Sequence, residues 1–569
     1  MKSLYSNLVL LVALFLISSI KFSTAQTVAF PEAEGFGKFA SGGRGGDVYK
    51  VTNLNDNGPG SLRDACAIGG SRTIIFEISG NIELESDLII TQGNLTIAGQ
   101  TAPGDGICIK NASFIIQSSD VIVRHLRFRL GDNGFKDAEG NIIGANSEDK
   151  DVIRILGNPG GTRNVIFDHC SMSWSVDEIV EIYGGASEAD GVKDVTFQYC
   201  IFSEALHASH HDSGNNSEGF KISNNATNIT LFKNLFSSNW EHNIRSEGGS
   251  SFEMINNIVY NMKYTTAIGT ANKFSMINNY FKQGNPIVLS QYMADYYTAP
   301  GFFASQTKAY TSGNDSDISS LSELDGSFSP FQQENPPLDS GITADQVNET
   351  IIDIIENSGA ILPSRDAVDN RIISQYNNSS ALIIDTQAQV GGFPVLNSET
   401  ALLDSDNDGM PDSWEISNGL DFNNPNDRNI LNEAGHTNLE QYINGSNFAL
   451  STTDVTLNGT KNSFKVYHDV GNPRMLNIDF QGFQNTSNFN IYSVTGSLLY
   501  NKRIQGNGQK VSLKLNRSEF SSGLYLLSLT DDRKIQTKKI VINCEYPNVM
   551  IPNTQLILLT TSSNGGVSK

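Results

Sequence analysis

Two seven-residue segments in the middle of the chain, Ser251–Asn257 (SFEMINN) and Lys273–Asn279 (KFSMINN), are near-copies of each other and start 22 residues apart. Each is a short apolar strand that ends in two asparagines. A period near 22 residues with short strands and Asn or Gly turns is typical of a solenoid of parallel strands. The pattern occurs earlier in Asp120–Leu126 (DVIVRHL), Asn164–Cys170 (NVIFDHC), Asp194–Cys200 (DVTFQYC) and Asn228–Asn234 (NITLFKN). The sequence therefore predicts an all-β chain dominated by a parallel β-helix.

The seventh position of the repeat makes this register testable, because equivalent residues of neighbouring coils stack on one another. Asn234, Asn257 and Asn279 occupy it in the later coils, and we expect them to form an inward-facing amide ladder. Cys170 and Cys200 occupy it in two earlier coils and should be stacked neighbours. We expect small buried thiols there rather than a disulfide, and the odd total of five cysteines argues against a full disulfide framework.

The first repeats are more widely spaced, with starts 44, 30 and 34 residues apart. The extra residues predict loops, where binding sites are usually built. Four carboxylates of this stretch are candidates for such a site, namely Asp149, Asp151, Asp177 and Glu181. Adjacent coils lie about 4.8 Å apart, so these groups can converge on one face if a hard cation, an arginine or a shared proton offsets their repulsion. Separate, solvated loop acids are the alternative.

Basic side chains gather in the same stretch. Six of the eight histidines fall within it, namely His125, His169, His207, His210, His211 and His242. Asp168 and His169 are expected to form a structural pair. We predict a locally cationic cleft lined by His207, His210, His211, Lys221, His242 and Arg245, with Arg163 as a further substrate-binding residue. A zinc site of His207, His211 and Asp212 is a weaker alternative, because no spacing enforces tetrahedral geometry.

An acidic segment, Asp404–Glu415 (DSDNDGMPDSWE), fits a twelve-position calcium loop. Gly409 at position 6 allows the sharp turn that such loops need. The carboxylates at positions 1, 3, 5, 9 and 12 are Asp404, Asp406, Asp408, Asp412 and Glu415. We expect a small EF-hand-like module over residues 396–450 that binds Ca²⁺ for a structural purpose.

The two ends of the chain carry different signals. Residues 1–25 combine Lys2, an apolar run and Ser-Thr-Ala before Gln26, which predicts a secretory signal peptide and no membrane span in the mature form. Ile342–Asn357 has helical spacing, and Thr343 to Gln346 resembles a capping box at its start. Alternating strands over 460–543 predict a β-sandwich, whereas the tail 544–569 shows no readable pattern.

The net charge of −22 argues against nucleic acid as a partner, because few cations are available to neutralise phosphates. An acidic chain can still bind a polyanionic glycan if its carboxylates hold Ca²⁺ and its cleft is locally positive. At 569 residues the chain should contain several domains.

Several blocks of sequence resemble polysaccharide lyase family 1, the pectate lyases. They are Phe30–Gly37 (FPEAEGFG), Gly42–Tyr49 (GGRGGDVY), Val51–Asp64 (VTNLNDNGPGSLRD), Ile97–Ile107 (IAGQTAPGDGI), Val165–Trp174 (VIFDHCSMSW), Pro363–Ile372 (PSRDAVDNRI), Gly391–Pro394 (GGFP) and Gly435–Tyr442 (GHTNLEQY). The resemblance implies a right-handed parallel β-helix over 26–395 and Ca²⁺-assisted β-elimination on a uronate-containing polysaccharide. By the same resemblance Asp151, Asp177 and Glu181 fall on calcium-ligand positions, with Asp149 a weaker match.

The catalytic segment departs from the family pattern. The family shows a stretch like H-N-x-x-R-N-P-R whose first arginine is the base, whereas Ser238–Arg245 reads SNWEHNIR. His242 therefore replaces the expected base and Arg245 is kept, and we assign catalysis to these two residues and Lys221. A neutral histidine is a reasonable base near pH 7.

This departure leaves the activity open. Pectate, ulvan, alginate or another uronan fits as the substrate, and so does a dehydratase reaction on terminal uronates. A β-helical glycoside hydrolase and a non-catalytic glycan-binding protein are the remaining alternatives. We expect a monomer.

The last domain resembles the type IX secretion sorting domain. The matching stretches are Phe464–Tyr467 (FKVY), Ile491–Gly496 (IYSVTG), Ser522–Tyr525 (SGLY) and Lys538–Ile542 (KKIVI). The resemblance implies the type IX secretion machinery as a partner and a secreted or cell-surface location.

Overall fold

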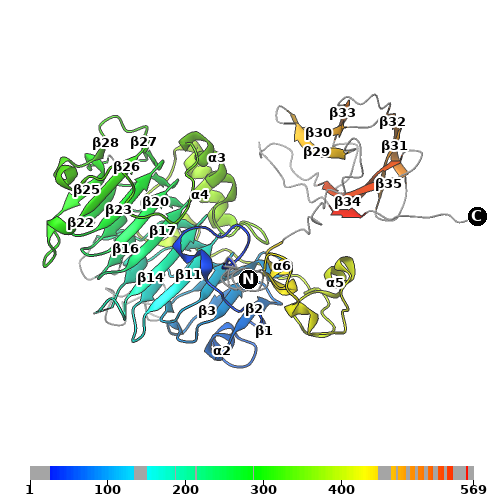
Figure 1. Cartoon of the computed structure of the whole chain (residues 1–569), viewed down its shortest axis with the longest axis horizontal. Coiled ribbons are helices and arrows are strands. Elements are labelled where there is room, and N and C mark those ends of the chain that lie inside the picture. The colour runs from blue at the N-terminus through cyan, green and yellow to red at the C-terminus, as the bar shows by residue number, and fades with distance from the viewer. Residues whose placement is uncertain are drawn as a thin grey trace, which may run out of the picture. The chain divides into compact units, whose positions relative to one another are not determined.

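The computed structural model describes residues 26–132, 150–185, 187–209, 211, 215–285 and 288–445, together with strands between 463 and 561. The predicted signal peptide, Asp149, His210 and Asp212 lie outside the described residues. The chain divides into two compact units, Met1–Asn444 and Gly445–Lys569. In the first unit, three sheets of parallel strands wind into a solenoid (Figure 1), which confirms the predicted parallel β-helix.

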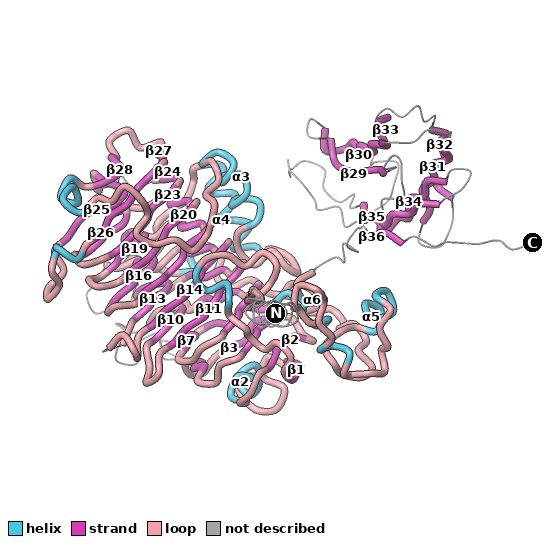
Figure 2. The backbone as a smooth tube through the Cα atoms, viewed as in Figure 1, coloured by secondary structure: helices cyan, strands magenta, loops and turns pink. Residues whose placement is uncertain are grey.

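Each full coil contributes one strand to each of three sheets, and the chain visits them in the same order every time (Figure 2). Sheet 1 contains β1 (Asp47–Val51), β2 (Arg72–Phe76), β5 (Leu95–Ala98), β8 (Val121–Arg124), β11 (Thr162–Asp168), β14 (Val192–Gln198), β17 (Thr227–Phe232), β20 (Ser251–Ile255), β23 (Lys273–Ile277) and β26 (Lys308–Ser312). Sheet 2 contains β3 (Gly80–Glu83), β6 (Ile107–Lys110), β9 (Arg127–Arg129), β12 (Ser171–Ser173), β15 (Ile201–Ser203), β18 (Leu235–Ser237), β21 (Ile258–Tyr260), β24 (Tyr280–Lys282) and β27 (Asp315–Ser316). Sheet 3 contains β4 (Leu88–Ile90), β7 (Phe114–Ile116), β10 (Ile153–Leu156), β13 (Glu178–Tyr183), β16 (Glu218–Ser223), β19 (Glu241–Ser246), β22 (Thr266–Gly269), β25 (Tyr292–Tyr297) and β28 (Ser322–Leu324).

The corner between sheets 1 and 2 is turned by a single residue in the left-handed region. His125, His169, Tyr199, Lys233 and Asn256 have φ angles of 53°, 51°, 49°, 53° and 54°. Equivalent rings stack there, with centroids 4.9 Å apart both between the two histidines and between His169 and Tyr199. The predicted pair is also present, since His169 Nδ1 lies 2.9 Å from Asp168 Oδ1.

The residue after this corner points into the coil. Asn234 Nδ2 donates to Asn257 Oδ1 at 2.9 Å, and Asn257 Nδ2 donates to Asn279 Oδ1 at 3.0 Å, so the predicted amide ladder is confirmed. Asn314 extends it by one coil, accepting from Asn279 at 2.8 Å. Cys170 and Cys200 are buried and form no disulfide, as expected.

Most helices and short 3-10 turns lie outside the coils, but α2 and the turn at Phe328 contribute buried side chains to the core of the solenoid. The helices are α2 (Leu62–Ala67), α3 (Val347–Asn357), α4 (Ala367–Asn378), α5 (Asp412–Asn418) and α6 (Asn438–Ile443). The 3-10 turns are η1 (Phe36–Phe39), η2 (Gly99–Thr101), η5 (Ala304–Gln306), η6 (Gly326–Phe331), η7 (Gln387–Val390) and η8 (Asp427–Asn429).

The predicted capping box at Thr343 is wrong, because α3 begins four residues later with Gln346 at its N-cap and no side-chain capping bond. Tertiary contacts take the backbone before the helix instead. Asp345 N donates to Asn256 Oδ1 at 2.9 Å, and its carbonyl accepts from Asn256 and Asn278.

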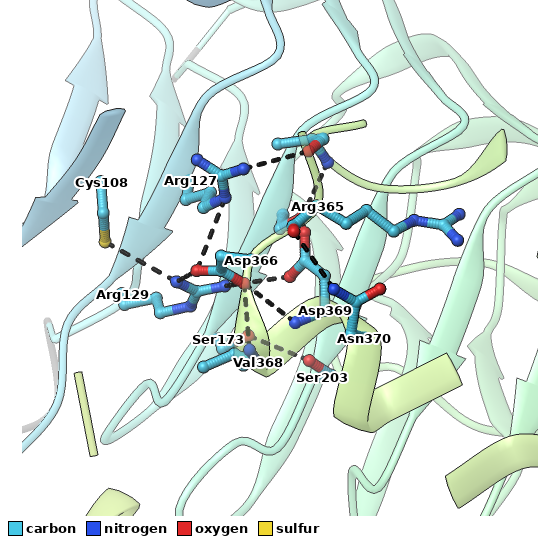
Figure 3. Close-up of polar contacts among 12 residues, drawn as sticks. Cys108, Arg127, Arg129, Ser173, Ser203, Arg365, Asp366, Val368, Asp369 and Asn370 are labelled. Atoms are coloured by element: carbon cyan, nitrogen blue, oxygen red, sulfur yellow. Dashed lines mark hydrogen bonds and ion pairs between the residues drawn. The ribbon is translucent and has the colours of Figure 1, made fainter. Parts of the chain in front are cut away.

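Helices α3 and α4 cover the outer face of sheet 2, where Ile354 and Ile372 pack against Ile201 and Leu235. A buried ion cluster fastens α4 to the sheet (Figure 3). Arg129 of β9 donates to Asp366 Oδ2 at 2.5 Å and to Asp369 Oδ1 at 2.9 Å. Asp366 is also the N-cap of α4.

The acidic module packs on the outer face of the first strands of sheet 1. Met410, Leu439 and Ile443 contact Ile75 and Ala98. Polar contacts reinforce this docking, since Arg44 Nε lies 2.8 Å from Glu440 and Lys50 Nζ lies 3.0 Å from Asp404.

The second unit consists of antiparallel strands. One sheet contains β29 (Ser463–Asp469), β30 (Asn472–Gln481) and β33 (Val511–Asn516). The other contains β32 (Leu498–Ile504), β31 (Ser487–Ser493), β34 (Gly523–Thr530), β35 (Ile535–Ile542) and β36 (Leu559–Thr561). Among the described residues, no helix has the length and apolar character that crossing a membrane requires.

Candidate active site

Charged side chains form a row across sheet 3, because they occupy matching positions on neighbouring strands. Arg154 of β10 pairs in register with Glu181 of β13, which pairs with Lys221 of β16 and then with Arg245 of β19. Arg154 NH2 lies 2.8 Å from Glu181 Oε2, and Lys221 Nζ lies 3.6 Å from Glu181 Oε1. The row thus contains three cations and one carboxylate on successive strands of a single sheet, in the order Arg154, Glu181, Lys221 and Arg245.

A second group of carboxylates lies beside this row and is buried. Asp151, Asp177 and Glu178 each offer an oxygen within 4.8 Å of the others, and their exposed fractions are 1%, 8% and 1%. Burial and the neighbouring Glu178 raise the pKa of Asp177 to about 10. The same two causes raise the pKa of Asp151 well above its usual value. At neutral pH the three carboxyl groups can therefore all be ionised only if a further cation lies beside them.

Glu178 is the centre of this carboxylate group. Burial alone would raise its pKa, but His242 and Lys221 hold the pKa of Glu178 well below its usual value. Neither of its oxygens accepts a hydrogen bond, although Lys221 Nζ lies 3.1 Å from Oε1. Two buried oxygens in this state suit a hard cation, which is bound by carboxylates of this kind.

His242 lies between a carboxylate and a guanidinium. Its Nδ1 is 2.6 Å from Glu218 Oε2, and its Nε2 is 3.1 Å from Arg245 NH1. Burial lowers the pKa of His242, but Glu178 and Glu218 outweigh burial and raise it to about 9. The contact with Arg245 instead requires a neutral ring. A guanidinium only donates hydrogen bonds, so Nε2 must carry no proton and must accept. That geometry assigns the ring proton to Nδ1, facing Glu218.

The structure gathers most of the residues predicted for the cleft. Asp151, Asp177, Glu181, Lys221, His242 and Arg245 lie together on sheet 3, and His211 Nε2 is 3.6 Å from Asp177. His207 lies further out, with its ring 4.5 Å from that of Trp240 and its Nδ1 3.7 Å from Asp385. The zinc alternative gains no support, because no three-ligand group among the described residues includes His207 or His211.

Two of the predicted residues lie in surroundings that do not favour their predicted roles. Arg163 lies at the start of β11 in sheet 1, where it is exposed and donates to the Ala189 carbonyl at 3.3 Å, away from the sheet 3 cluster. His242 is 6% exposed, and its two ring nitrogens face Glu218 Oε2 at 2.6 Å and Arg245 NH1 at 3.1 Å. A buried ring with no free nitrogen is poorly placed to remove a proton from a sugar.

Sequence reasoning did not assign roles to Glu178 and Glu218. Their signal is a recurring offset, because each stands three residues before a charged member of the sheet 3 row, as Asp151 stands before Arg154. Glu218 joins Glu178 and His242 in a further group of potential ligands.

The acidic loop also differs in one member from its predicted pattern. Asp404, Asp406 and Asp408 form one close group, and Asp408, Glu415 and Asp427 form another. Asp412 instead accepts from the backbone N and the hydroxyl of Ser405, both at 2.7 Å. Burial and the neighbouring acids raise the pKa of Asp408 to about 7 and that of Glu415 to about 8.

The fold and this cluster define the class, which is a parallel β-helix with a buried, cation-flanked carboxylate site on one outer sheet. Comparison with known proteins supplies the family. The chain is 34% identical over 445 residues to a probable pectate lyase C of Aspergillus fumigatus, covering 75% of this chain and 96% of that protein. It is 32% identical over 441 residues to a probable pectate lyase C of Aspergillus flavus, with coverages of 75% and 96%. The chain therefore belongs to the pectate lyase family, and it is a polysaccharide lyase.

Two further matches complete the comparison. A mutant pectate lyase of Bacillus subtilis of known structure is 15% identical, with a TM-score of 0.42 over 59% of this chain and 99% of that one. Residues 472–543 match the family described as "Secretion system C-terminal sorting domain", which confirms the sorting domain that the sequence predicts.

Proposed function

We propose that the protein is an exported, Ca²⁺-dependent lyase that cleaves pectate by β-elimination, leaving 4,5-unsaturated uronate ends. The observation that carries this proposal is the buried group of Asp151, Asp177 and Glu178 beside the cations of the sheet 3 row. These carboxyl groups need a cation beside them to be ionised together, and their oxygens are the ligands that Ca²⁺ prefers. Glu181 stays a candidate ligand by family position, although it is ion-paired with Arg154 and Lys221.

The site's own residues divide the work of elimination. Ca²⁺ bound there would pair with the substrate carboxylate and make the C5 proton more acidic. Arg245 is the most exposed of the three predicted catalytic side chains, at 37%, against 23% for Lys221 and 7% for His242. We therefore assign removal of the C5 proton to Arg245, which must first release one proton to solvent so that a neutral guanidine nitrogen can accept the C5 proton. The C5–H electrons form the C4–C5 double bond as the C4 oxygen leaves and takes a proton from solvent.

Lys221 has a different role. Burial alone would lower its pKa, but Glu178 and Glu181 raise the pKa of Lys221. Lys221 therefore remains an ammonium and binds the sugar acid. His211 is placed to contact the substrate near Asp177, and His207 further along the same face.

The signal peptide over residues 1–25 and the sorting domain support export through the type IX machinery to the medium or the cell surface. We expect the enzyme to act as a monomer.

An absorbance assay tests the reaction and its metal. Incubating the full chain with polygalacturonate should raise the ultraviolet absorbance of the conjugated product, a chelator should abolish the rise, and Ca²⁺ in excess should restore it. New reducing ends without this absorbance would instead mean hydrolysis.

Parallel incubations with ulvan and alginate identify the uronan. Elimination on one of these and none on polygalacturonate would change the assigned substrate. A rise in absorbance with no new reducing ends and no shortening of the chains would indicate dehydration of terminal uronates, because water rather than a sugar oxygen then leaves from C4.

We also propose that the acidic loop binds a structural Ca²⁺ through Asp404, Asp406, Asp408, Glu415 and Asp427. Buried oxygens without hydrogen bonds on Asp406, Asp408, Glu415 and Asp427 support this set. Because the module packs on sheet 1, bound Ca²⁺ should stabilise the first coils. When the free Ca²⁺ concentration is a hundred times the dissociation constant of the site, binding adds about 2.7 kcal/mol to the free energy of unfolding.

A matched pair of variants tests this loop. Asp427→Asn should remove most of the Ca²⁺-dependent rise in the unfolding midpoint, whereas Asp412→Asn should retain it, because the amide oxygen can still accept from Ser405. The reverse result would restore the ligand set expected from the sequence.

A further inference from the structure

The Arg245 guanidinium depends on a buried partner for its orientation. Arg245 NH1 lies 3.1 Å from His242 Nε2, and His242 Nδ1 lies 2.6 Å from Glu218 Oε2. Other neighbours are more distant, with Glu247 Oε1 3.6 Å from Arg245 Nε and the Tyr297 ring centroid 5.2 Å from its guanidinium carbon. The three residues form a line that runs from the buried edge of the carboxylate group to the exposed face.

The backbone is shaped to build this line. Between β16 and β19 the pairing passes from Phe220 opposite Asn243 to Lys221 opposite Arg245, so Ile244 is extra. Such a bulge re-aims side chains and is common next to active sites. His242 also has a φ of 53°, in the left-handed region that few residues other than glycine adopt. The irregular strand turns the His242 ring toward Glu218 and keeps Arg245 level with Lys221.

We propose that Glu218 and His242 are positioning residues that hold the Arg245 guanidinium in place over the sugar-binding face. The inference rests on the proposed role of Arg245 in elimination. The Glu218 carboxylate, 2.6 Å from Nδ1, favours the proton on that nitrogen and so leaves Nε2 as an acceptor for Arg245. An arginine held at one nitrogen loses less side-chain freedom on binding substrate, and preorganisation of this kind lowers the barrier to reaction.

A histidine-to-glutamine replacement separates positioning from proton removal, because an amide oxygen can accept from Arg245 but cannot act as a base at neutral pH. His242→Ala should lower kcat on polygalacturonate about 100-fold, the usual cost of misplacing a reacting group, and change KM about twofold or less. His242→Gln should recover kcat to within about tenfold of the unmodified enzyme. Equal loss in both variants would make His242 the base and overturn the proposal. Unchanged kcat in the alanine variant would overturn it as well.

Substitutions of Glu218 provide a second, independent test of the positioning role. Glu218→Gln keeps an oxygen that accepts from Nδ1 and should retain more kcat than Glu218→Ala. Equal kcat for these two variants would contradict the tautomer argument. His169→Gln, at the corner of sheets 1 and 2, is the matched control and should leave kcat unchanged. Urea midpoints are measured for every variant, and a loss of activity that merely follows a lower midpoint would reduce His242 to a structural role.

The activity of the unmodified enzyme distinguishes a failure of the proposed function from a failure of the positioning role. If it eliminates no uronan, the proposed function fails before any variant is compared. If it is active and His242 variants behave as described for a base, only the positioning role fails.

Discussion

Arg245→Ala should reduce kcat for elimination about 1,000-fold, because removing a group that transfers a proton in the transition state typically costs between about 10² and 10⁴. KM should change little, since Lys221 and Arg154 remain on the same sheet to attract the substrate carboxylate. Initial rates of absorbance increase on polygalacturonate, measured over a range of concentrations with saturating Ca²⁺, give both constants. Arg245→Lys should stay close to the alanine variant, because an ammonium cannot reproduce the planar fork that reaches both His242 and the sugar.

The control for this prediction is another arginine of the same chain. Arg163→Ala should keep kcat and KM within about twofold, as expected for a surface change away from the site, because Arg163 lies on sheet 1 and contacts the Ala189 carbonyl. A higher KM with unchanged kcat in Arg245→Ala would mean that Arg245 only binds the substrate. Loss of activity in Arg163→Ala would mean that Arg163 does bind the substrate, as the sequence predicts.

The sequence predicts the solenoid well because its evidence is repeated. Every coil must bury a similar strand, so an Asn or Cys at the seventh position implies the same contact in the next coil. The ladder of Asn234, Asn257 and Asn279 is a direct consequence of that register. The active site shares this advantage in part, because residues three apart recur on successive coils. These pairs are Asp151 with Arg154, Glu178 with Glu181, Glu218 with Lys221, and His242 with Arg245.

The remaining features depend on contacts that the repeat does not encode. The start of α3 is set by Asn256 and Asn278, which bind the Asp345 backbone from coils far earlier in the chain. Asp427 reaches the acidic loop from outside the twelve-residue pattern. His242 occupies the place of a family arginine, but its ring is buried beside Glu178 and Glu218, which no spacing reveals. Local pattern predicts which residues share a coil, whereas tertiary packing decides which of them meet solvent.

Arg129→Leu should destabilise the first unit by about 3–5 kcal/mol, the usual cost of removing one partner from a buried ion pair. Arg129 is fully buried and contacts Asp366 and Asp369 (Figure 3). Without it, two carboxylates that fasten α4 to sheet 2 lose their main partner. Urea unfolding followed by tryptophan fluorescence measures this, because Trp174, Trp240 and Trp414 all lie in the first unit. Glu83→Gln, which removes an exposed ion pair with Lys110, should cost about 1 kcal/mol or less.

The pH dependence of the same variant should change sign. Burial alone would raise the pKa of Asp366, but Arg129 and then Arg127 lower it to about 2, against about 3.9 in an unfolded chain. The stabilisation from this pairing is therefore complete above about pH 4 and is lost as the pH falls toward 2. In Arg129→Leu burial is no longer offset by that guanidinium, so the folded-state pKa of Asp366 should rise above its unfolded value. The charged form then costs stability at neutral pH, and lowering the pH from 7 to 5 should stabilise the variant relative to the unmodified protein. Parallel pH profiles for the two proteins would mean that Arg129 is not the main partner of these carboxylates.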